Sequence, residues 1–463
     1  MNRQWLLFWL ASVTFFMQSL DSTMLYMALP AISLSMHLSA LQLDSALYMD
    51  VVIVAYIVAF IIFTPLTGWL CGCLNEKTVY VISLAIFIAG SLWCAFANSL
   101  SELVTARFIQ GIGGALMLPV IKTVLLRITI PSLKLMLLNR VTLMGIGGVI
   151  LGPVLAGFLI ACFSWRMIFM INVPIAFACL FMAQTIIPDL TKCKQSFSHK
   201  GYFLIVGALL LFLFGVMTAG KPYIQRQYNL MFFLCAALLI LVYKVRFFDK
   251  NPDGTLNALL KVKTFAIALS GSMLSRILIS STPVVLSTML QTKLGFDSMV
   301  VSMIMLSFSM GFVFSKLMLE KLLQGLGFRY VLMLSTVLTA ISIMLLCLSM
   351  AEKSIFTFAV LNFMFGWCSS TLYSSLNILA FSDLTDDTYN SGNSVITVAQ
   401  LMSIAVSTSL SFLLLRFFSA YEIPLGVSNY GVFFLVVAVI LPSCCFFFNR
   451  LNQKDGRYLI QGS

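Results

Sequence analysis

Long apolar segments dominate the chain and follow one another with only short polar breaks. Six lie in the first part, at about 5–33, 47–70, 78–97, 102–126, 139–162 and 166–187. Two more follow at about 201–219 and 229–247, and then six at about 264–291, 298–320, 329–350, 354–380, 394–418 and 430–448. Because a helix needs about 20 apolar residues to cross roughly 30 Å of hydrocarbon, each segment predicts a transmembrane helix. The predicted fold is therefore an all-α polytopic membrane protein with fourteen spans.

The six, two and six grouping predicts four parts of the chain. These are an N-terminal six-helix bundle at 1–190, two extra transmembrane helices with a cytoplasmic linker at 191–263, a C-terminal six-helix bundle at 264–450, and a cytoplasmic tail at 451–463. The longest stretch between spans, at about 248–263, has turn residues followed by a short amphipathic run that ends in lysines. We expect this stretch to lie along the cytoplasmic membrane surface.

Composition supports the membrane assignment and the charges orient it. Hydrophobic residues make up 60% and charged residues 10% of the chain, against about 45–50% and about 25% in soluble proteins. The net charge of +12 is scattered between apolar runs, whereas a nucleic-acid binder would gather it on one face. Of the 28 Lys and Arg, twenty fall on the side of the termini and six on the other. By the positive-inside rule both termini are predicted to be cytoplasmic.

Several kinds of chemistry are not supported by the sequence. The eleven cysteines lack redox or zinc spacing, and the two histidines, His37 and His199, lie outside the apolar runs. We therefore expect no disulfide framework, no haem and no metal site. No GxxxxGK phosphate loop is present, which argues against an ATP-driven pump. A nucleophile, acid pair or metal cluster is not visible either, so we expect no catalytic residues and no enzyme activity.

Three charged residues lie where the bilayer makes them costly. Asp21 is the one acid placed deep in a span, about 24 Å along the first helix. An embedded carboxyl that faces each side in turn can take up and release a proton; the alternative is a static hydrogen bond between helices. Arg107, near the external end of the fourth span, can pair with Asp21 or extend to the interface. Arg276 lies about 18 Å into the ninth span, where backbone carbonyls, Asn or Gln side chains, or an anionic substrate group can satisfy it.

Several motifs resemble those of the major facilitator superfamily. They are Leu-Asp-Ser-Thr-Met-Leu-Tyr-Met-Ala-Leu-Pro at 20–30, Arg-Phe-Ile-Gln-Gly-Ile-Gly-Gly-Ala at 107–115, Gly-x-x-Gly-x-x-x-Gly-Pro-x-x-x-Gly at 145–157 and Trp-Arg-Met-Ile-Phe-Met-Ile-Asn-Val-Pro at 165–174. In the second half, Ser-Gly-Ser-Met-Leu-Ser-Arg at 270–276 and Leu-Gln-Thr-Lys-Leu-Gly-Phe at 290–296 continue the likeness. With the two extra spans, the chain resembles the superfamily's fourteen-span drug:proton antiporters, and among them the MdtD-type multidrug transporters. The resemblance covers nearly the whole chain.

The resemblance implies two six-helix bundles around a central cavity, which opens to each side of the membrane in turn. It also implies roles for individual residues. Asp21 matches the first-span acid and Arg107 the fourth-span arginine implicated in proton transfer. Gly152 with Pro153 matches the antiporter motif of the fifth span, and Asn172 and Pro174 match the start of the sixth. The spacing of Gly148 and Gly152 itself predicts close helix packing, and Pro153 adds a kink. Together with Gly157, these residues form the predicted conformational and packing motif.

The chain departs from the family pattern in two places. Between the second and third spans the family has Gly-x-Leu-Ala-Asp-Arg-x-Gly-Arg, whereas Gly72, Cys73 and Asn75 replace its Asp, its first basic residue and its Gly. The charged latch that this loop forms in the family is thus absent or rebuilt here, with Glu76 and Lys77 as the residues available. Tyr26 stands where the first-span motif usually has Asn, which would place a phenol in or near the cavity.

These observations favour an inner-membrane secondary transporter that exports amphipathic small molecules in exchange for protons. The alternatives are an importer or facilitator of a nutrient, metabolite or siderophore, and a transporter-derived sensor. The residues expected to line the substrate cavity are Gln18, Tyr26, Gln110, Arg276, Gln291, Asn377 and Gln400. We expect no cofactor, since the proton gradient supplies the energy. The expected partners are a small-molecule substrate, protons and membrane lipids, with no nucleic acid. Whether there is also an export partner in the outer envelope is left open.

Overall fold

The structure is a computed structural model of the chain. It describes residues 3–36, 50–128, 131–188, 199–218, 226–243, 259–384, 386–419 and 428–452. All regular secondary structure in these ranges is helical. The amphipathic stretch expected at 248–263 and the tail at 451–463 fall mostly outside the described ranges, and the predictions about them stay untested.

Eight α-helices and one 3₁₀ turn form the described part of the first 188 residues. They are α1 (Arg3–Ser35), α2 (Asp50–Phe63), η3 (Thr64–Leu66), α3 (Thr67–Leu74), α4 (Glu76–Phe96), α5 (Leu100–Ile128), α6 (Pro131–Cys162), α7 (Met167–Met170) and α8 (Asn172–Ile186). The second predicted span is divided at Pro65, which opens the 3₁₀ turn between α2 and α3 because its ring cannot continue the α-helical hydrogen bonds.

The later helices fall into a pair and a larger group. The pair is α9 (His199–Thr218) and α10 (Arg226–Tyr243). The group is α12 (Lys263–Ile279), α13 (Thr282–Thr292), α14 (Ser298–Leu348), η5 (Ser349–Ala351), α15 (Ile355–Ser382), α16 (Asp386–Ser419), α17 (Asn429–Ile440), η6 (Leu441–Ser443) and α18 (Cys444–Phe448). The loop expected between spans at 320 and 329 is helical instead. The direction of α14 changes at Gly327, whose φ of 76° and ψ of 165° are not helical.

Eleven helical stretches of the described residues are long and apolar enough to cross a membrane. They do not include α1, which has the length but carries Gln18 and Asp21 in its middle. The α14 stretch, 51 residues long, covers two predicted spans. In place of the eighth predicted span there is only a shorter apolar helix, Met231–Val242. The multi-pass architecture is confirmed, whereas the count of fourteen stays a prediction.

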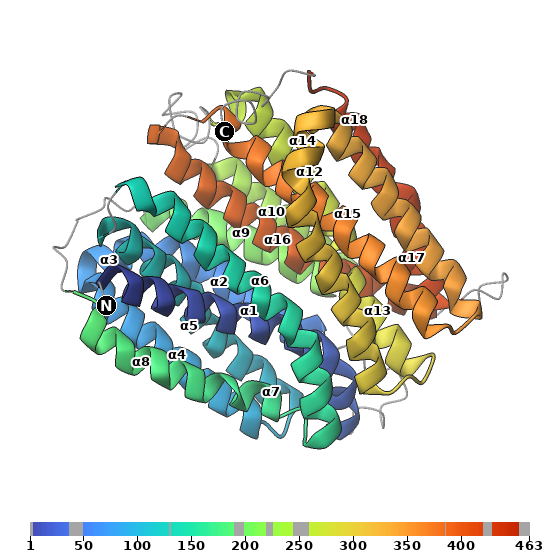
Figure 1. Ribbon diagram of the computed structural model, residues 1–463, viewed down its shortest axis with the longest axis horizontal. Helices are drawn as coiled ribbons and strands as arrows, with labels where there is room; N and C mark the ends of the chain where they lie inside the picture. Colours follow the sequence, from blue (N-terminus) through green and yellow to red (C-terminus); the bar gives the residue numbers. More distant parts are fainter. Residues whose placement is uncertain are drawn as a thin grey trace. The chain divides into compact units, whose positions relative to one another are not determined.

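The chain divides into two compact units. One contains Met1–His199 with Gly295–Ser302, and the other contains Lys200–Leu294 with Met303–Ser463. In the first unit α1 packs against α5, α6 and α8, and α4 packs against α5 and α8 (Figure 1). A core of fully buried apolar side chains, including Leu7, Phe87, Val120 and Ala183, joins these helices. The four domain boundaries predicted above are not tested by this division.

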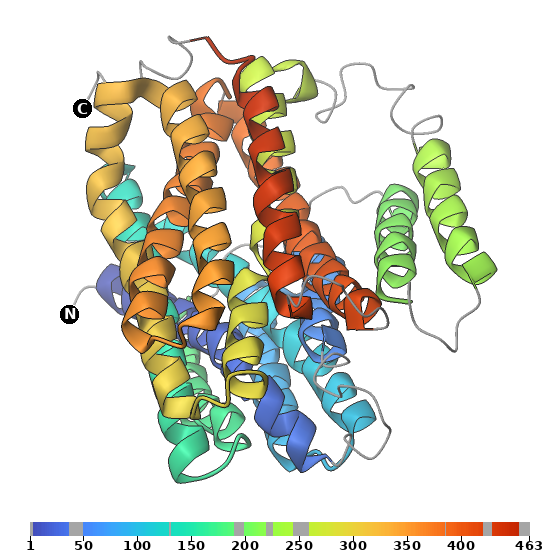
Figure 2. The ribbon, with the colours of Figure 1, turned by 90° about the vertical axis from the view of Figure 1, so that its right-hand side faces the viewer.

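In the second unit α12 packs against α15, α16, α17 and α18. The α14 and α15 helices approach closely through glycines, because a Cβ at Gly311 would meet the backbone of Phe363 and one at Gly366 the backbone of Phe308. The α9 and α10 helices lie side by side (Figure 2) and contact each other through edge-to-face phenylalanine pairs, with Phe212 on Phe233 and Phe214 on Phe232.

Candidate functional site

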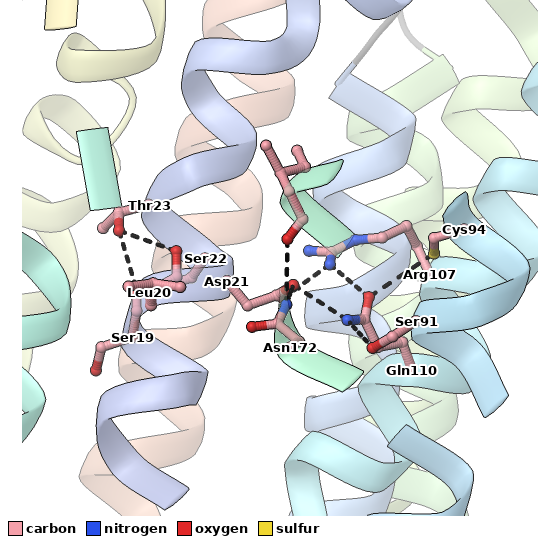
Figure 3. A network of polar contacts seen from close by, with 11 residues as sticks. Ser19, Leu20, Asp21, Ser22, Thr23, Ser91, Cys94, Arg107, Gln110 and Asn172 are labelled. Carbon is pink, nitrogen blue, oxygen red and sulfur yellow. Dashed lines mark hydrogen bonds and ion pairs between the residues drawn. The ribbon is translucent and has the colours of Figure 1, made fainter. Parts of the chain in front are cut away.

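The candidate site centres on Asp21, in the middle of α1. Its side chain is 1% exposed. A carboxylate inside a membrane protein is costly unless it is paired, so Asp21 needs partners. The hydroxyls of Ser22 and Thr23 beside it donate hydrogen bonds back to the Ser19 carbonyl, both at 2.9 Å. These hydroxyls are therefore satisfied within α1. The Asp21 carboxylate instead points away toward α5 and α8 (Figure 3).

Arg107 of α5 supplies the charge that balances Asp21. Its Nη1 lies 2.8 Å from Asp21 Oδ2, and the arginine side chain is 2% exposed. The guanidinium carbon also lies 4.3 Å from the centre of the Tyr56 ring and 5.7 Å from that of Phe169, so aromatic faces replace part of the lost hydration. The ion pair expected from the sequence is thus formed, and Arg107 does not extend to the interface.

Two amides complete the shell around the carboxylate. Asp21 Oδ1 accepts hydrogen bonds from Asn172 Nδ2 at 2.8 Å and from Gln110 Nε2 at 3.1 Å. Gln110 also donates to Ser91 Oγ at 2.9 Å and accepts from Arg107 Nη1 at 2.6 Å. Gln110 was expected to line the substrate cavity, but its amide is engaged within the ion-pair network. Asn172 was expected only as a packing residue, and the structure adds a direct contact with the carboxylate.

Glycines explain how the helices come close enough to build this network. A Cβ at Gly90 of α4 would meet the backbone of Gln110, and one at Gly111 of α5 would meet the Tyr56 carbonyl. A Cβ at Gly114 would press on the Tyr56 hydroxyl at 2.7 Å. The motif at 107–115 therefore has two functions. Its polar members bind Asp21, and its glycines let α2 and α4 approach α5.

The glycine motif of α6 faces α1. A Cβ at Gly148 would meet the Phe16 carbonyl, and one at Gly152 would meet the Thr23 side chain. Both positions lie along the part of α1 that carries Asp21. Gly157 lies off this face, and its Cβ would meet Ser302 of the same unit. Pro153 lies inside α6, and Pro174 lies in the first turn of α8, where no backbone hydrogen-bond donor is needed.

The other two cavity candidates of the first unit lie on α1 near Asp21. Gln18 is half-buried, and its Oε1 has no hydrogen-bond partner among the described residues. Tyr26 is also half-buried and follows Asp21 by five residues on α1. Whether either residue contacts a substrate stays a prediction.

The second unit contains the remaining predicted residues. Gln400 Nε2 donates to Asn377 Oδ1 at 2.8 Å, which joins α16 to α15. Gln291 Nε2 donates to Ser287 Oγ at 3.3 Å, one turn earlier in α13. Asn362 of α15 is fully buried and donates to the Ile304 carbonyl at 2.8 Å, which is a helix-packing contact.

Arg276 contacts none of the protein partners that the sequence suggests. Neither a backbone carbonyl nor an Asn or Gln side chain accepts from it among the described residues. Its Nε donates to Ser272 Oγ at 3.2 Å, and its guanidinium carbon lies 4.2 Å from the centre of the Tyr373 ring. A serine one turn earlier on the same helix and an aromatic face from α15 take the place of the expected protein partners, and the alternative of an anionic substrate group stays a prediction.

The segment at 68–77 keeps a charged contact in a new form. Asn75, which replaces the family's glycine, has φ 79° and ψ 144°, a conformation that glycine adopts far more readily than other residues. Glu76 follows it, is 2% exposed and forms an ion pair with Arg127 at the end of α5. Glu76 was one of the residues considered for a rebuilt latch, whereas its partner Arg127 was not.

Sequence reasoning missed several members of these sites. Ser91, Tyr56 and Phe169 have no unusual sequence context, since a serine or aromatic residue in a membrane helix is common. Lys316 was counted among the cytoplasmic loop charges, although it lies inside α14 and donates a hydrogen bond to Ser374 of α15. Its place near the end of a predicted span concealed it.

The site holds the buried carboxylate of Asp21 beside the buried guanidinium of Arg107, within a bundle of membrane-spanning helices. Among the described residues no group of three or more His, Cys, Asp or Glu could hold a metal ion. The described residues thus form a multi-pass α-helical membrane protein with a buried ion pair inside its N-terminal helices. The sequence matches the Major Facilitator Superfamily over residues 11–248 and 268–457, and the chain belongs to that superfamily.

Individual relatives agree with this assignment. The chain is 30% identical to MdtD of Citrobacter koseri over 90% of this chain and 87% of that protein, whose name assigns multidrug resistance provisionally. MdtD of Klebsiella pneumoniae strain 342 is 30% identical over 97% of this chain and 95% of its own length. The "probable transport protein HsrA" of Haemophilus influenzae is also 30% identical, over 97% of this chain and 96% of its own length.

Solved structures share the fold at much lower identity. A D-xylose-proton symporter aligns with a TM-score of 0.68 at 12% identity and covers 98% of this chain and 99% of its own. A peptide transporter of the POT family, in an auto-inhibited form, gives a TM-score of 0.68 at 14% identity over 96% and 98%. These similarities show the fold alone.

Proposed function

We propose that the chain is a proton-coupled secondary transporter that exports amphipathic small molecules across the bacterial inner membrane by alternating access. The observation that carries the proposal is the buried Asp21 carboxylate, bound to Arg107 inside membrane-spanning helices. Membership of the superfamily and the names of the bacterial relatives support transport and multidrug export. Both termini are placed in the cytoplasm on the charge bias described above.

The geometry suggests how a proton enters the cycle. The ionised carboxylate accepts from Arg107, Gln110 and Asn172. Protonation removes its negative charge and weakens the bond to the arginine. Arg107 Nη1 already donates to Gln110 Oε1 at 2.6 Å, so the guanidinium keeps an acceptor when Asp21 is neutral. The pair therefore has two arrangements, and exposure of Asp21 to one side at a time would couple them to alternating access.

The proposal needs no cofactor, metal or catalytic residue, because the proton gradient supplies the energy. Its partners are the small-molecule substrate, protons and surrounding lipids, with no nucleic acid. Whether export continues through a partner in the outer envelope is a separate question that the site does not address.

The test is transport in liposomes that contain a pH-sensitive dye. Gradients of lipophilic cations, amphipathic anions and siderophore-like compounds are imposed on wild-type protein and on the Asp21→Asn variant. Glu102→Gln is the matched control, since it removes one carboxylate at an exposed position in the first turn of α5. We expect substrate-triggered proton movement in wild type and in Glu102→Gln, and at least a tenfold loss in Asp21→Asn, since only Asp21 lies in the buried network.

Two outcomes would contradict the proposal. If a solute crosses equally well with wild type and Asp21→Asn and no protons move, the protein is a facilitator and Asp21 is structural. If no solute crosses with either protein although both are folded, the sensor alternative replaces transport.

A further inference from the structure

Two of the cations inside membrane helices of the second unit contact no acid among the described residues. They are Arg276 of α12 and Lys316 of α14. The ion pairs of Arg107 with Asp21 and of Arg127 with Glu76 both belong to the first unit. The carboxylates described in the second unit, Glu320, Glu352 and Asp383, are all exposed. An unbalanced positive charge within a bilayer is costly, so its presence calls for a compensating group.

The two cations contact neighbouring residues of the same helix. The Arg276 guanidinium carbon lies 4.2 Å from the centre of the Tyr373 ring, and the Lys316 ammonium donates to the hydroxyl of Ser374. Both contacts are therefore at one level of α15. Two positive groups held near each other repel, and an anion between them would relieve that repulsion.

Both side chains keep hydrogen-bonding capacity. Arg276 uses only its Nε, which donates to Ser272 Oγ at 3.2 Å. Its two terminal nitrogens have no partner among the described residues, and they are not among the fully enclosed polar atoms. A guanidinium with both terminal nitrogens available can hold a carboxylate through two parallel bonds. The Lys316 ammonium has three donors and uses one of them on Ser374.

The surroundings suit a ligand with an apolar body and a polar group. The Phe312 ring centre lies 5.4 Å from the Lys316 nitrogen. Asn377 follows Tyr373 by four residues on α15, so the two side chains share a face of that helix. Asn377 is joined to Gln400 through one polar atom of each amide, which leaves the other atoms available to a ligand.

We propose that Arg276 and Lys316 bind the carboxylate, or a similar acidic group, of the transported molecule. The substrates are then amphipathic anions rather than the cations often associated with multidrug export. This inference rests on the proposed transport function and specifies its substrate class. An acidic lipid headgroup has the same chemistry and is distinguished from a solute by the experiment below.

The test compares two fluorescent probes, one of which carries a negative charge that the other lacks. Dansylglycine carries a carboxylate, and its methyl ester has nearly the same shape without it. Binding of each probe is titrated against the purified full-length protein in a neutral detergent. We expect wild type to bind the acid about tenfold or more tightly than the ester, as the loss of hydrogen bonds to a charged group predicts.

Variants assign the preference to the two cations. Arg276→Gln should weaken binding of the acid about 10-fold to about 100-fold and leave the ester within about twofold of wild type. Arg276→Lys should recover part of the loss, since it keeps the charge without the paired donors. Lys316→Gln provides a second, independent variant. Lys321→Gln is the matched control, because it removes one exposed charge from the same helix and should change neither dissociation constant.

Several results would overturn the inference. Wild type that fails to prefer the acid, or fails to bind it at all, excludes an anion site. If none of the folded variants loses the preference for the acid over the ester, the two cations do not bind the ligand. Competition by phosphatidylglycerol at membrane-like concentrations assigns the site to a lipid headgroup instead of a solute.

The outcomes also separate this inference from the proposed function. Arg276-dependent binding of dansylglycine without proton movement in liposomes would retain the anion site and reject proton coupling. Proton movement triggered equally by the acid and by the ester would retain coupling and reject the anion site.

Discussion

Asp21 and Arg107 are buried together, and each is costly to bury alone. Removal of one partner from a buried ion pair leaves an uncompensated charge, which costs about 3–5 kcal/mol, whereas removal of both costs much less. We therefore expect Arg107→Met to lower the free energy of unfolding by about 3–5 kcal/mol. The double variant Asp21→Asn with Arg107→Met should recover most of that loss. The measurement is unfolding of the purified protein in one detergent, monitored by helical circular dichroism.

A matched arginine gives the control for that cycle. Arg450 is exposed and contacts the Phe446 ring at 5.4 Å. Arg450→Met should change the free energy of unfolding by less than about 0.5 kcal/mol. A loss in the double variant equal to the sum of the losses in Asp21→Asn alone and in Arg107→Met alone would show that the pair contributes no coupling. The network would then be a set of independent contacts.

The two oxygens of the Asp21 carboxylate accept from different kinds of donor, and this difference matters for the transport cycle. Oδ2 accepts from the charged arginine, whereas Oδ1 accepts from the two neutral amides of Gln110 and Asn172. Because the amide contacts do not depend on a countercharge, they can hold the side chain in place while its bond to Arg107 changes. The amides therefore position the acid, and the arginine responds to its charge.

At the scale of elements, the contact between α1 and α6 decides how Asp21 is held. A Cβ at Gly148 would meet the backbone carbonyl of Phe16, which cannot move without displacing α1. We expect Gly148→Ala to lower the free energy of unfolding by about 1–3 kcal/mol, since α1 and α6 must separate. It should also reduce proton-coupled transport. Thermal unfolding and the liposome assay measure the two effects.

The preceding residue offers an internal control. At Gly147 the nearest atoms to an added Cβ are those of the Phe16 ring at 3.8 Å, which is ordinary contact. Gly147→Ala should leave transport unchanged and raise the free energy of unfolding by up to about 1 kcal/mol, because alanine favours helix over glycine. If both variants behave alike, close approach of α1 and α6 is not what the motif provides.

The sequence predicted the elements well because the membrane restricts them so strongly. Apolar length alone places a helix, since a chain in lipid must satisfy its backbone internally. Polar residues in the middle of α1 were visible as exceptions, and so Asp21 could be found. The glycine spacing of α6 indicated close packing, but it did not say that α1 is the partner. Partners of a helix depend on tertiary contacts that no local pattern encodes.

The residues around each charge were harder to predict for the same reason. Asn172 and Ser91 come from helices far apart in the chain, and only the fold brings them to Asp21 and Gln110. Lys316 lay near a predicted span end, where lysines usually extend to the interface. Its contact with α15 depends on the packing of α14, in which helix continues through the expected loop up to Gly327.

At the scale of the whole molecule, orientation follows from the distribution of positive charge. The twenty Lys and Arg on the side of the termini predict a cytoplasmic face. Cys73 and Cys162 are both exposed, and an odd number of predicted spans separates them. They should therefore react from opposite sides of the membrane. In spheroplasts, a variant that keeps only Cys162 should react with a membrane-impermeant maleimide, and one that keeps only Cys73 should react only after permeabilisation.

A third single-cysteine variant tests the span count itself. With an even count of fourteen, Ser463→Cys at the C-terminus lies on the same side as Cys73 and should react only after permeabilisation. With an odd count the new cysteine would react in intact spheroplasts while Cys73 stays protected. The reason is that one more or one fewer membrane-spanning helix between α8 and the C-terminus moves the C-terminus to the other side of the membrane. Reaction of Cys73 from outside would instead invert the whole orientation and make the proposed export an import. The three accessibilities together thus separate a wrong count from a wrong orientation.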